Sequence, residues 1–221
     1  MFYRWIPHAL TLGNLLSGCI GILLFPQWPA AWFVWISCLF DFSDGFAARL
    51  LRVTSPLGKQ LDSLADVVSF GLLPALLMQA LLKEFYGEGL IPYLSLLIVC
   101  CAAWRLAVFN IDDAQHDSFR GLPTPANALF ITGLPFFADL GWRIPGPALI
   151  VICIIFSFLM VSPIRLFSLK FTDFSMRKNK LQLTFLFLAV LSTVILKFAA
   201  IPFVILLYIV ASFTVRKRIQ E

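Results

Sequence analysis

The chain has 221 residues, of which 60% are hydrophobic and 13% are charged. A soluble domain usually carries about 25% charged residues, so this composition argues against a separate soluble domain. The net charge of +5 does not indicate nucleic-acid binding, because the basic residues are spread over short loops and helix ends, as in membrane proteins. The five cysteines lie in apolar runs without metal-type spacing, which favours free thiols.

Continuous apolar runs predict an all-α, polytopic integral membrane bundle of about eight transmembrane helices, forming a single domain over residues 1–221. With both termini in the cytoplasm, fourteen of the 17 Lys and Arg residues fall on the cytoplasmic side and three on the other. We therefore expect a protein of the cell (inner) membrane. The expected spans are 8–25, 29–51, 60–82, 90–110, 123–140, 146–165, 181–198 and 200–215.

The first span contains two polar residues, Thr11 and Asn14, about one turn apart on a helix that should be apolar. Hydrogen bonds between membrane helices would account for them. The alternative is a place in a ligand site.

The second and third spans carry four of the 12 acidic residues of the chain. Asp41 and Asp44 fall on one face of the second span, and Asp62 and Asp66 lie one turn apart on the third. The link 54–56, Thr-Ser-Pro, suits a tight turn between antiparallel helices, so the two pairs can converge. The distribution of basic residues over the loops predicts that this acidic motif lies at the cytoplasmic side.

Intramembrane acids are costly and are functional candidates by default. Converging carboxylates repel each other unless a cation lies between them, and their oxygen atoms suit Mg²⁺ or Mn²⁺. Ion pairs with Arg49, Arg52 and Lys59 are the alternative, but salt bridges do not require the small residues that accompany the acids.

The motif resembles the signature of the CDP-alcohol phosphatidyltransferase family, with eight defined positions at fixed spacing: Asp41-x2-Asp44-Gly45-x2-Ala48-Arg49-x8-Gly58-x3-Asp62-x3-Asp66. The resemblance implies a membrane-embedded enzyme that uses two divalent cations, Mg²⁺ or Mn²⁺, to replace CMP on a CDP-linked lipid with an alcohol. It also implies metal ligands and a catalytic general base among the acids. The implied ligands are Asp41, Asp44, Asp62 and Asp66, and Asp66 is also the implied base.

The same resemblance implies a nucleotide and phosphate site. Gly45 and Ala48 lack bulk, so a nucleotide can lie against the second span, and the guanidinium of Arg49 offers forked donors to phosphate. The start of the first span resembles the Pro-Asn-x2-Thr-x2-Asn opening of phosphatidylserine synthases, although His8 stands where that branch usually has Asn. The expected nucleotide- and phosphate-binding residues are Thr11, Asn14, Gly45, Ala48, Arg49 and Gly58.

Two further stretches, 61–75 and 105–126, resemble the phosphatidylserine synthase branch of the family. This implies CDP-diacylglycerol and L-serine as substrates, with Arg105, Asn110 and Arg120 as serine-binding residues. On physical grounds alone, Arg105 could equally be a snorkelling arginine at the interface. The branch usually has Arg where Val108 stands, a charge that Arg120 could replace. The resemblance further implies a homodimer surrounded by membrane lipids.

The residue types alone do not select the acceptor, because glycerol 3-phosphate and inositol phosphate also need basic residues. A phosphatidyltransferase for glycerol 3-phosphate, an inositol compound or choline is therefore the first alternative. A divalent-cation transporter is an alternative from another class. It would distribute acids across the bilayer, whereas these acids cluster at one face beside Gly and Arg.

Overall fold

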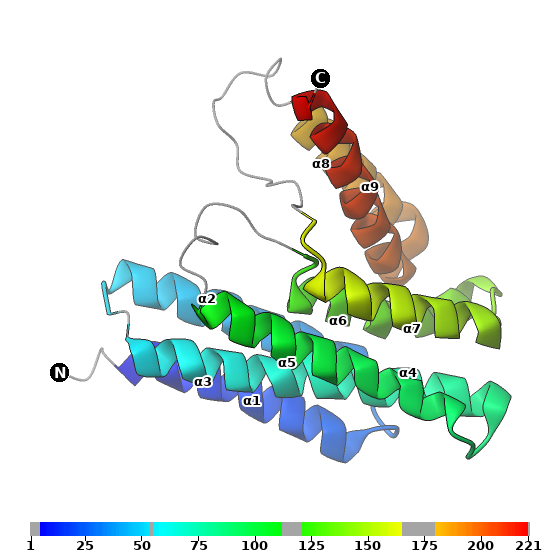
Figure 1. Cartoon of the computed structure of the whole chain (residues 1–221), viewed down its shortest axis with the longest axis horizontal. Coiled ribbons are helices and arrows are strands. Elements are labelled where there is room, and N and C mark those ends of the chain that lie inside the picture. Colours follow the sequence, from blue (N-terminus) through cyan, green and yellow to red (C-terminus); the bar gives the residue numbers. More distant parts are fainter. Residues whose placement is uncertain (1–4, 54, 112–120, 165–179, 221) are drawn as a thin grey trace.

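The computed structural model in Figure 1 describes residues 5–53, 55–111, 121–164 and 180–220, with side chains over 187–212 in the last range. Within these ranges every regular element is helical, which confirms the all-α fold class. The elements are α1 (Ile6–Leu24), α2 (Ala30–Leu50), α3 (Pro56–Asp66), the π-helix η2 (Val67–Leu72), α4 (Leu73–Tyr86), the 3-10 helix η3 (Ile91–Ser95), α5 (Leu96–Ile111), α6 (Thr124–Gly133), the 3-10 helix η5 (Leu134–Leu140), α7 (Gly146–Val161), α8 (Lys180–Leu196), the 3-10 helix η6 (Lys197–Ala199) and α9 (Ala200–Gln220).

Each expected apolar run corresponds to one of these helices or to a helix with its π or 3-10 extension. Four of the described helical stretches are long and apolar enough to cross a membrane: Ile6–Leu24, Pro56–Tyr86, Ile91–Ile111 and Phe187–Ser212. The last of these includes parts of α8 and α9, between which the backbone turns at Lys197 with φ 51°. The number of about eight spans therefore remains a prediction.

Helix α1 has its polar and small residues inside and its large apolar residues outside. The inward face carries Thr11, Asn14, Ser17, Gly18 and Gly21. The outward face is a stripe of exposed side chains at helical spacing: Leu12, Leu16, Ile20 and Leu23. This arrangement is typical of a helix that contacts lipid on one side and other helices through small residues on the other.

Small residues bring α1 close to its neighbours. A Cβ atom added to Gly18 would lie 2.8 Å from Ser69 Cα of η2, and one added to Gly21 would lie 2.7 Å from Phe33 Cβ of α2. The turn after α2 leads into α3 through Ser55, whose hydroxyl accepts a hydrogen bond from the Gly58 amide at 3.0 Å. Pro56 follows as the first helical residue, a position where its missing N–H costs nothing. After this turn, α3 packs alongside α1.

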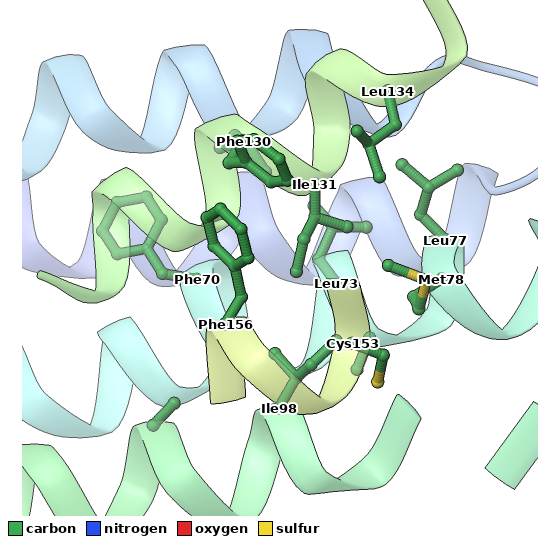
Figure 2. Close-up of a cluster of buried hydrophobic side chains, with 14 of the residues drawn as sticks. Phe70, Leu73, Leu77, Met78, Ile98, Phe130, Ile131, Leu134, Cys153 and Phe156 are labelled. Carbon is green, nitrogen blue, oxygen red and sulfur yellow. The ribbon is translucent and has the colours of Figure 1, made fainter. Parts of the chain in front are cut away.

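The apolar core lies between η2, α4, α5, α6 and α7 (Figure 2). Phe130 of α6 and Phe156 of α7 stack with their ring centroids 3.8 Å apart. Phe70 of η2 belongs to the same buried cluster and is fully buried. The core thus packs α6 and α7 against the helical segment that follows Asp66.

The segment before α6 is fixed to the end of α7. The Gly121 amide donates to the Ile164 carbonyl at 2.8 Å, and the Leu122 amide donates to the Leu159 carbonyl at 3.0 Å. Gly121 has φ 72°, and an added Cβ would lie 2.2 Å from the Met160 carbonyl oxygen. Only glycine fits this position without displacement of the backbone.

Helices α8 and α9 form a hairpin that leaves the long bundle at an angle (Figure 1). It packs against α6 through α9 and against η5 through η6. A Cβ on Gly133 would lie 2.6 Å from Pro202 Cδ. An aromatic cluster joins the hairpin to α2 and η5, with Trp35 at 5.0 Å from Phe198 and 6.1 Å from Phe136 between ring centroids.

Candidate functional site

Three carboxylates from two helices converge in the bundle. Each of Asp41, Asp62 and Asp66 has a carboxylate oxygen within 4.8 Å of those of the other two. Asp41 comes from α2 and the other two from α3, as the spacing predicts. The fourth acid, Asp44, is outside this group but lines the same pocket as Asp62.

Helix α1 holds two of the four acids through the polar residues on its inner face. The Thr11 hydroxyl lies 2.5 Å from Asp44 Oδ2 and 3.0 Å from the Pro7 carbonyl. Asn14 Nδ2 donates to Asp66 Oδ1 at 3.1 Å. Asn14 is fully buried, and its backbone carbonyl accepts from the Ser37 hydroxyl at 3.2 Å. The side chain of Asn14 therefore holds the carboxylate of Asp66 in place from α1.

A pocket of about 610 Å³ opens beside the acids. It is formed where the first turns of α1 and α3 meet the last turns of α2. Four residues expected at a nucleotide site line it, namely Thr11, Gly45, Ala48 and Gly58. The remaining lining residues are Pro7, His8, Asp44, Val53, Ser55, Pro56, Lys59 and Asp62.

The two glycines of the motif meet this pocket in different ways. A Cβ added to Gly45 would have no atom within 4 Å, so this face of α2 is open to a ligand. A Cβ added to Gly58 would lie 3.0 Å from His8 Cε1 and 3.2 Å from Ser55 Oγ. Gly58 thus permits α1 and α3 to pack closely.

Two basic residues lie around the pocket. Arg49 is exposed and its Nε donates to the Gly45 carbonyl at 3.0 Å, so it lies at the rim rather than in the lining. Lys59 lines the pocket, and its ammonium donates to the Asn110 carbonyl at 2.9 Å. Lys59 therefore also ties the start of α3 to the end of α5.

The expected acceptor residues are only partly brought together. Arg105 of α5 interacts electrostatically with Asp66, and its Nε is buried without a hydrogen-bond partner in the described residues. Asn110 instead faces α3, where its amide donates to Ser63 Oγ at 2.8 Å. Arg120 lies outside the described residues.

The acids fit a divalent-cation site. Their oxygen donors are the type that Mg²⁺ and Mn²⁺ prefer, and their separation allows one ion to contact several of them. Asp62 Oδ1 is buried and accepts no hydrogen bond from the described residues. Such an orphaned charged atom is costly unless a cation or donor pairs with it.

Some features of the site were not expected from the sequence. The contribution of His8, Val53 and Ser55 to the pocket depends on how the turn after α2 meets α1. The resemblance of the chain start to a known opening had pointed to this region, but not to the pairing of Thr11 with Asp44. The π-helix directly after Asp66 was also not expected, because π-turns have no simple sequence pattern.

Comparison with known proteins supports the family resemblance of the acidic motif. The family model described as CDP-alcohol phosphatidyltransferase matches residues 4–140. The chain is 33% identical over 142 residues to the CDP-diacylglycerol–serine O-phosphatidyltransferase of Bacillus subtilis, covering 60% of this chain and 76% of the relative.

Archaeal relatives are also similar. A CDP-diacylglycerol–serine O-phosphatidyltransferase of Methanocaldococcus jannaschii is 38% identical over 129 residues, which cover 58% of this chain and 59% of the relative. An archaetidylserine synthase of Methanothermobacter thermautotrophicus is 34% identical over 169 residues, which cover 72% of this chain and 68% of the relative. The similarity thus extends over part of each chain.

Proposed function

Because the chain belongs to the CDP-alcohol phosphatidyltransferase family, we propose that it transfers the phosphatidyl group of CDP-diacylglycerol to the hydroxyl of L-serine and releases CMP. The observation that carries this proposal is the convergence of Asp41, Asp62 and Asp66 beside a pocket of about 610 Å³. The names of the similar proteins support serine as the acceptor.

The family is divalent-cation dependent, and the acids Asp41, Asp44, Asp62 and Asp66 would hold two ions, Mg²⁺ or Mn²⁺. When bound, these ions neutralise charge on the pyrophosphate and stabilise the leaving CMP. The protein itself keeps the carboxylates in place through the donors of α1. Asn14 orients Asp66, and Thr11 orients Asp44.

The nucleotide occupies the pocket in this proposal. Gly45 leaves the α2 face open, Ala48 adds little bulk, and Thr11 and Gly58 complete the wall. Arg49 at the rim is within reach of a phosphate by a change of side-chain rotamer, since its hydrogen bond among the described residues is to the carbonyl of Gly45 on its own helix.

Asp66 is the proposed general base. It removes the proton from the serine hydroxyl while the serine oxygen forms a bond to the phosphorus that carries diacylglycerol. The bond from that phosphorus to the CMP oxygen breaks, and CMP leaves with the bonding electron pair. The proton stays on Asp66 until it is released to solvent. Arg105 supplies a positive charge for the serine carboxylate, and Asn110 and Arg120 stay predictions for the same role.

We also propose one membrane domain of about eight spans, with the acids facing the cytoplasm of the cell (inner) membrane. The apolar helices and the distribution of basic residues support this arrangement. A homodimer remains an expectation from the family resemblance.

The test is CMP release by the purified protein in detergent with CDP-diacylglycerol and Mg²⁺ or Mn²⁺. L-serine, glycerol 3-phosphate, inositol, inositol phosphate and choline are offered separately. Release that requires serine and is lost on chelation supports the proposal. Release with another alcohol would support phosphatidyl transfer but would contradict serine as the acceptor. Failure with every acceptor would contradict phosphatidyl transfer.

A further inference from the structure

The start of α6 contains polar atoms that are buried without a partner. Thr124 and Asn127 are both 0% exposed. Thr124 Oγ1 and both side-chain amide atoms of Asn127 make no hydrogen bond in the part of the chain that the structure describes. Buried polar groups are usually paired, and an unpaired one lowers stability because lost water is not replaced. Three such atoms on one helical turn point to a missing ligand.

These side chains lean toward the positive end of a helix. Thr124 is the first residue of α6, and the preceding Pro123 provides no side-chain cap. Side chains on a helix tilt toward its N-terminus, so Thr124 and Asn127, one turn later, both approach this end. The unpaired peptide N–H groups of a helix start favour an anion.

Helix α6 also packs against the segment that follows the proposed base. The π-helix η2 follows Asp66 directly and packs against α6. Phe70, one turn after Asp66, lies in the same buried cluster as Phe130 of α6 (Figure 2). Helix α6 therefore packs against the segment that directly follows Asp66.

Arg105 approaches the same segment from α5. A Cβ on Gly71 of η2 would lie 3.4 Å from Ala102 Cβ, so the two helices touch about one turn before Arg105. The Arg105 guanidinium interacts electrostatically with Asp66, and its Nε is buried without a partner among the described residues. Helix α5, which carries Arg105, and helix α6, which begins at Thr124, thus both pack against η2.

We propose that Thr124 and Asn127 at the start of α6 form, with Arg105, a recess for the α-amino-acid group of the acceptor. The inference rests on the proposed function and assigns the part of the site that selects its acceptor. The carboxylate would receive hydrogen bonds from Arg105, the Thr124 hydroxyl and the Asn127 amide nitrogen. The Asn127 carbonyl oxygen would accept one from the ammonium group.

This recess distinguishes amino acids from other alcohols. Asn127 offers one side-chain acceptor and an amide donor, which match the ammonium and carboxylate of a free amino acid. Glycerol 3-phosphate and inositol compounds have no ammonium group, and choline has no carboxylate. Each would leave at least one buried atom of the recess unpaired, which discriminates strongly against such a ligand.

The test uses the full chain with Thr124→Val or Asn127→Leu. Each substitution replaces a polar group with an apolar one of similar size. We expect the KM for L-serine to rise about tenfold or more, the range for loss of a hydrogen bond to a charged group. The KM for CDP-diacylglycerol should not change. The thermal unfolding temperature should stay the same or rise, because an unpaired buried polar group has been removed.

Thr132→Val is the matched control on the same helix. Thr132 is 1% exposed, but its hydroxyl already donates to the Ala128 carbonyl at 2.7 Å. This variant should leave both KM values unchanged. Thr124→Ser retains the hydroxyl and should keep the KM for serine within about twofold of the wild type, which corresponds to less than 1 kcal/mol.

The outcomes separate the two proposals. Wild-type turnover with serine, together with an unchanged serine KM in Thr124→Val and Asn127→Leu, would overturn the recess but keep the function. A lower unfolding temperature with equal changes in both KM values would assign the two residues to packing and would also overturn the recess. If the wild type releases no CMP with serine, the proposed function fails, and the recess fails with it.

Discussion

Asp66 is the most enclosed of the four acids, at 5% exposed, and Asn14 Nδ2 donates to its Oδ1. We expect Asp66→Asn to lower the rate of CMP release by about 10²–10⁴-fold, the usual contribution of a general base. The protein should stay folded, because an asparagine oxygen can still accept from Asn14. The rate is measured with CDP-diacylglycerol and serine, and folding by thermal unfolding.

The control for this substitution is Asp139→Asn, at an exposed position on η5. It should have wild-type activity. Near-normal turnover by Asp66→Asn would remove Asp66 from the role of base.

Arg105→Ala tests whether the guanidinium of Arg105 binds the carboxylate of the acceptor. We expect the KM for serine to rise much more than the KM for CDP-diacylglycerol, because only serine brings a carboxylate to this guanidinium. Arg143→Ala, at an exposed arginine after η5, is the matched control. Equal increases for both substrates would assign Arg105 to the nucleotide site or to the scaffold.

Residue positions in the candidate site were predictable only where a motif fixed them. The helical spacing of the four acids predicted that they converge, and the structure brings Asp41, Asp62 and Asp66 within 4.8 Å of one another but leaves Asp44 outside this group. Which donor holds which acid was not predictable, because the pairing of Thr11 with Asp44 depends on the register between α1 and α2. Asn110 was expected near the acceptor, yet its amide is bound to Ser63.

At the level of the helices, some glycines permit close packing between helices, whereas Gly45 leaves space for a ligand. Gly45→Leu should fold, because a Cβ there has no atom within 4 Å, but it should abolish binding of CMP by filling the pocket. Calorimetric titration of CMP in the presence of Mg²⁺ measures the binding. Retained affinity for CMP would mean that the nucleotide does not lie against this face of α2.

Gly18→Ala is the comparison for this variant. Its Cβ would lie 2.8 Å from the Ser69 backbone, so the helices must separate. Overpacking of this kind costs about 1–3 kcal/mol. We therefore expect a lower unfolding temperature for Gly18→Ala than for Gly45→Leu, and the reverse order would contradict the packing of α1 on η2.

The positions of the helices followed from the sequence more closely than their internal geometry did. Apolar runs bounded by Pro, Gly and charged residues located each helix to within a few residues. The change from α- to π-helix at Val67 was not visible, because it arises from packing rather than from composition. The Gly-Leu-Pro stretch before α6 was noted as a resemblance, but its attachment to α7 is a tertiary contact.

For the whole molecule, the distribution of basic residues predicts a cytoplasmic location of both termini. A reporter that fluoresces only in the cytoplasm should be active at either end of the chain. Alkaline phosphatase, which requires export, should be inactive in the same fusions. It should be active when inserted near Arg143, which lies between the expected spans 123–140 and 146–165 on the non-cytoplasmic side. Activity of the phosphatase at the C-terminus, with the N-terminal reporter still fluorescent, would mean that the number of spans is odd.

The aromatic cluster of Trp32, Trp35, Phe136 and Phe198 gives the protein an internal optical probe. Asymmetrically packed indole rings produce near-ultraviolet circular dichroism, and Phe198 reaches them only when the hairpin of α8 and α9 is docked. Detachment of the hairpin should therefore weaken this signal while the far-ultraviolet helical signal persists. Detergents could then be ranked by how well they preserve the docked hairpin, independently of any enzymatic assay.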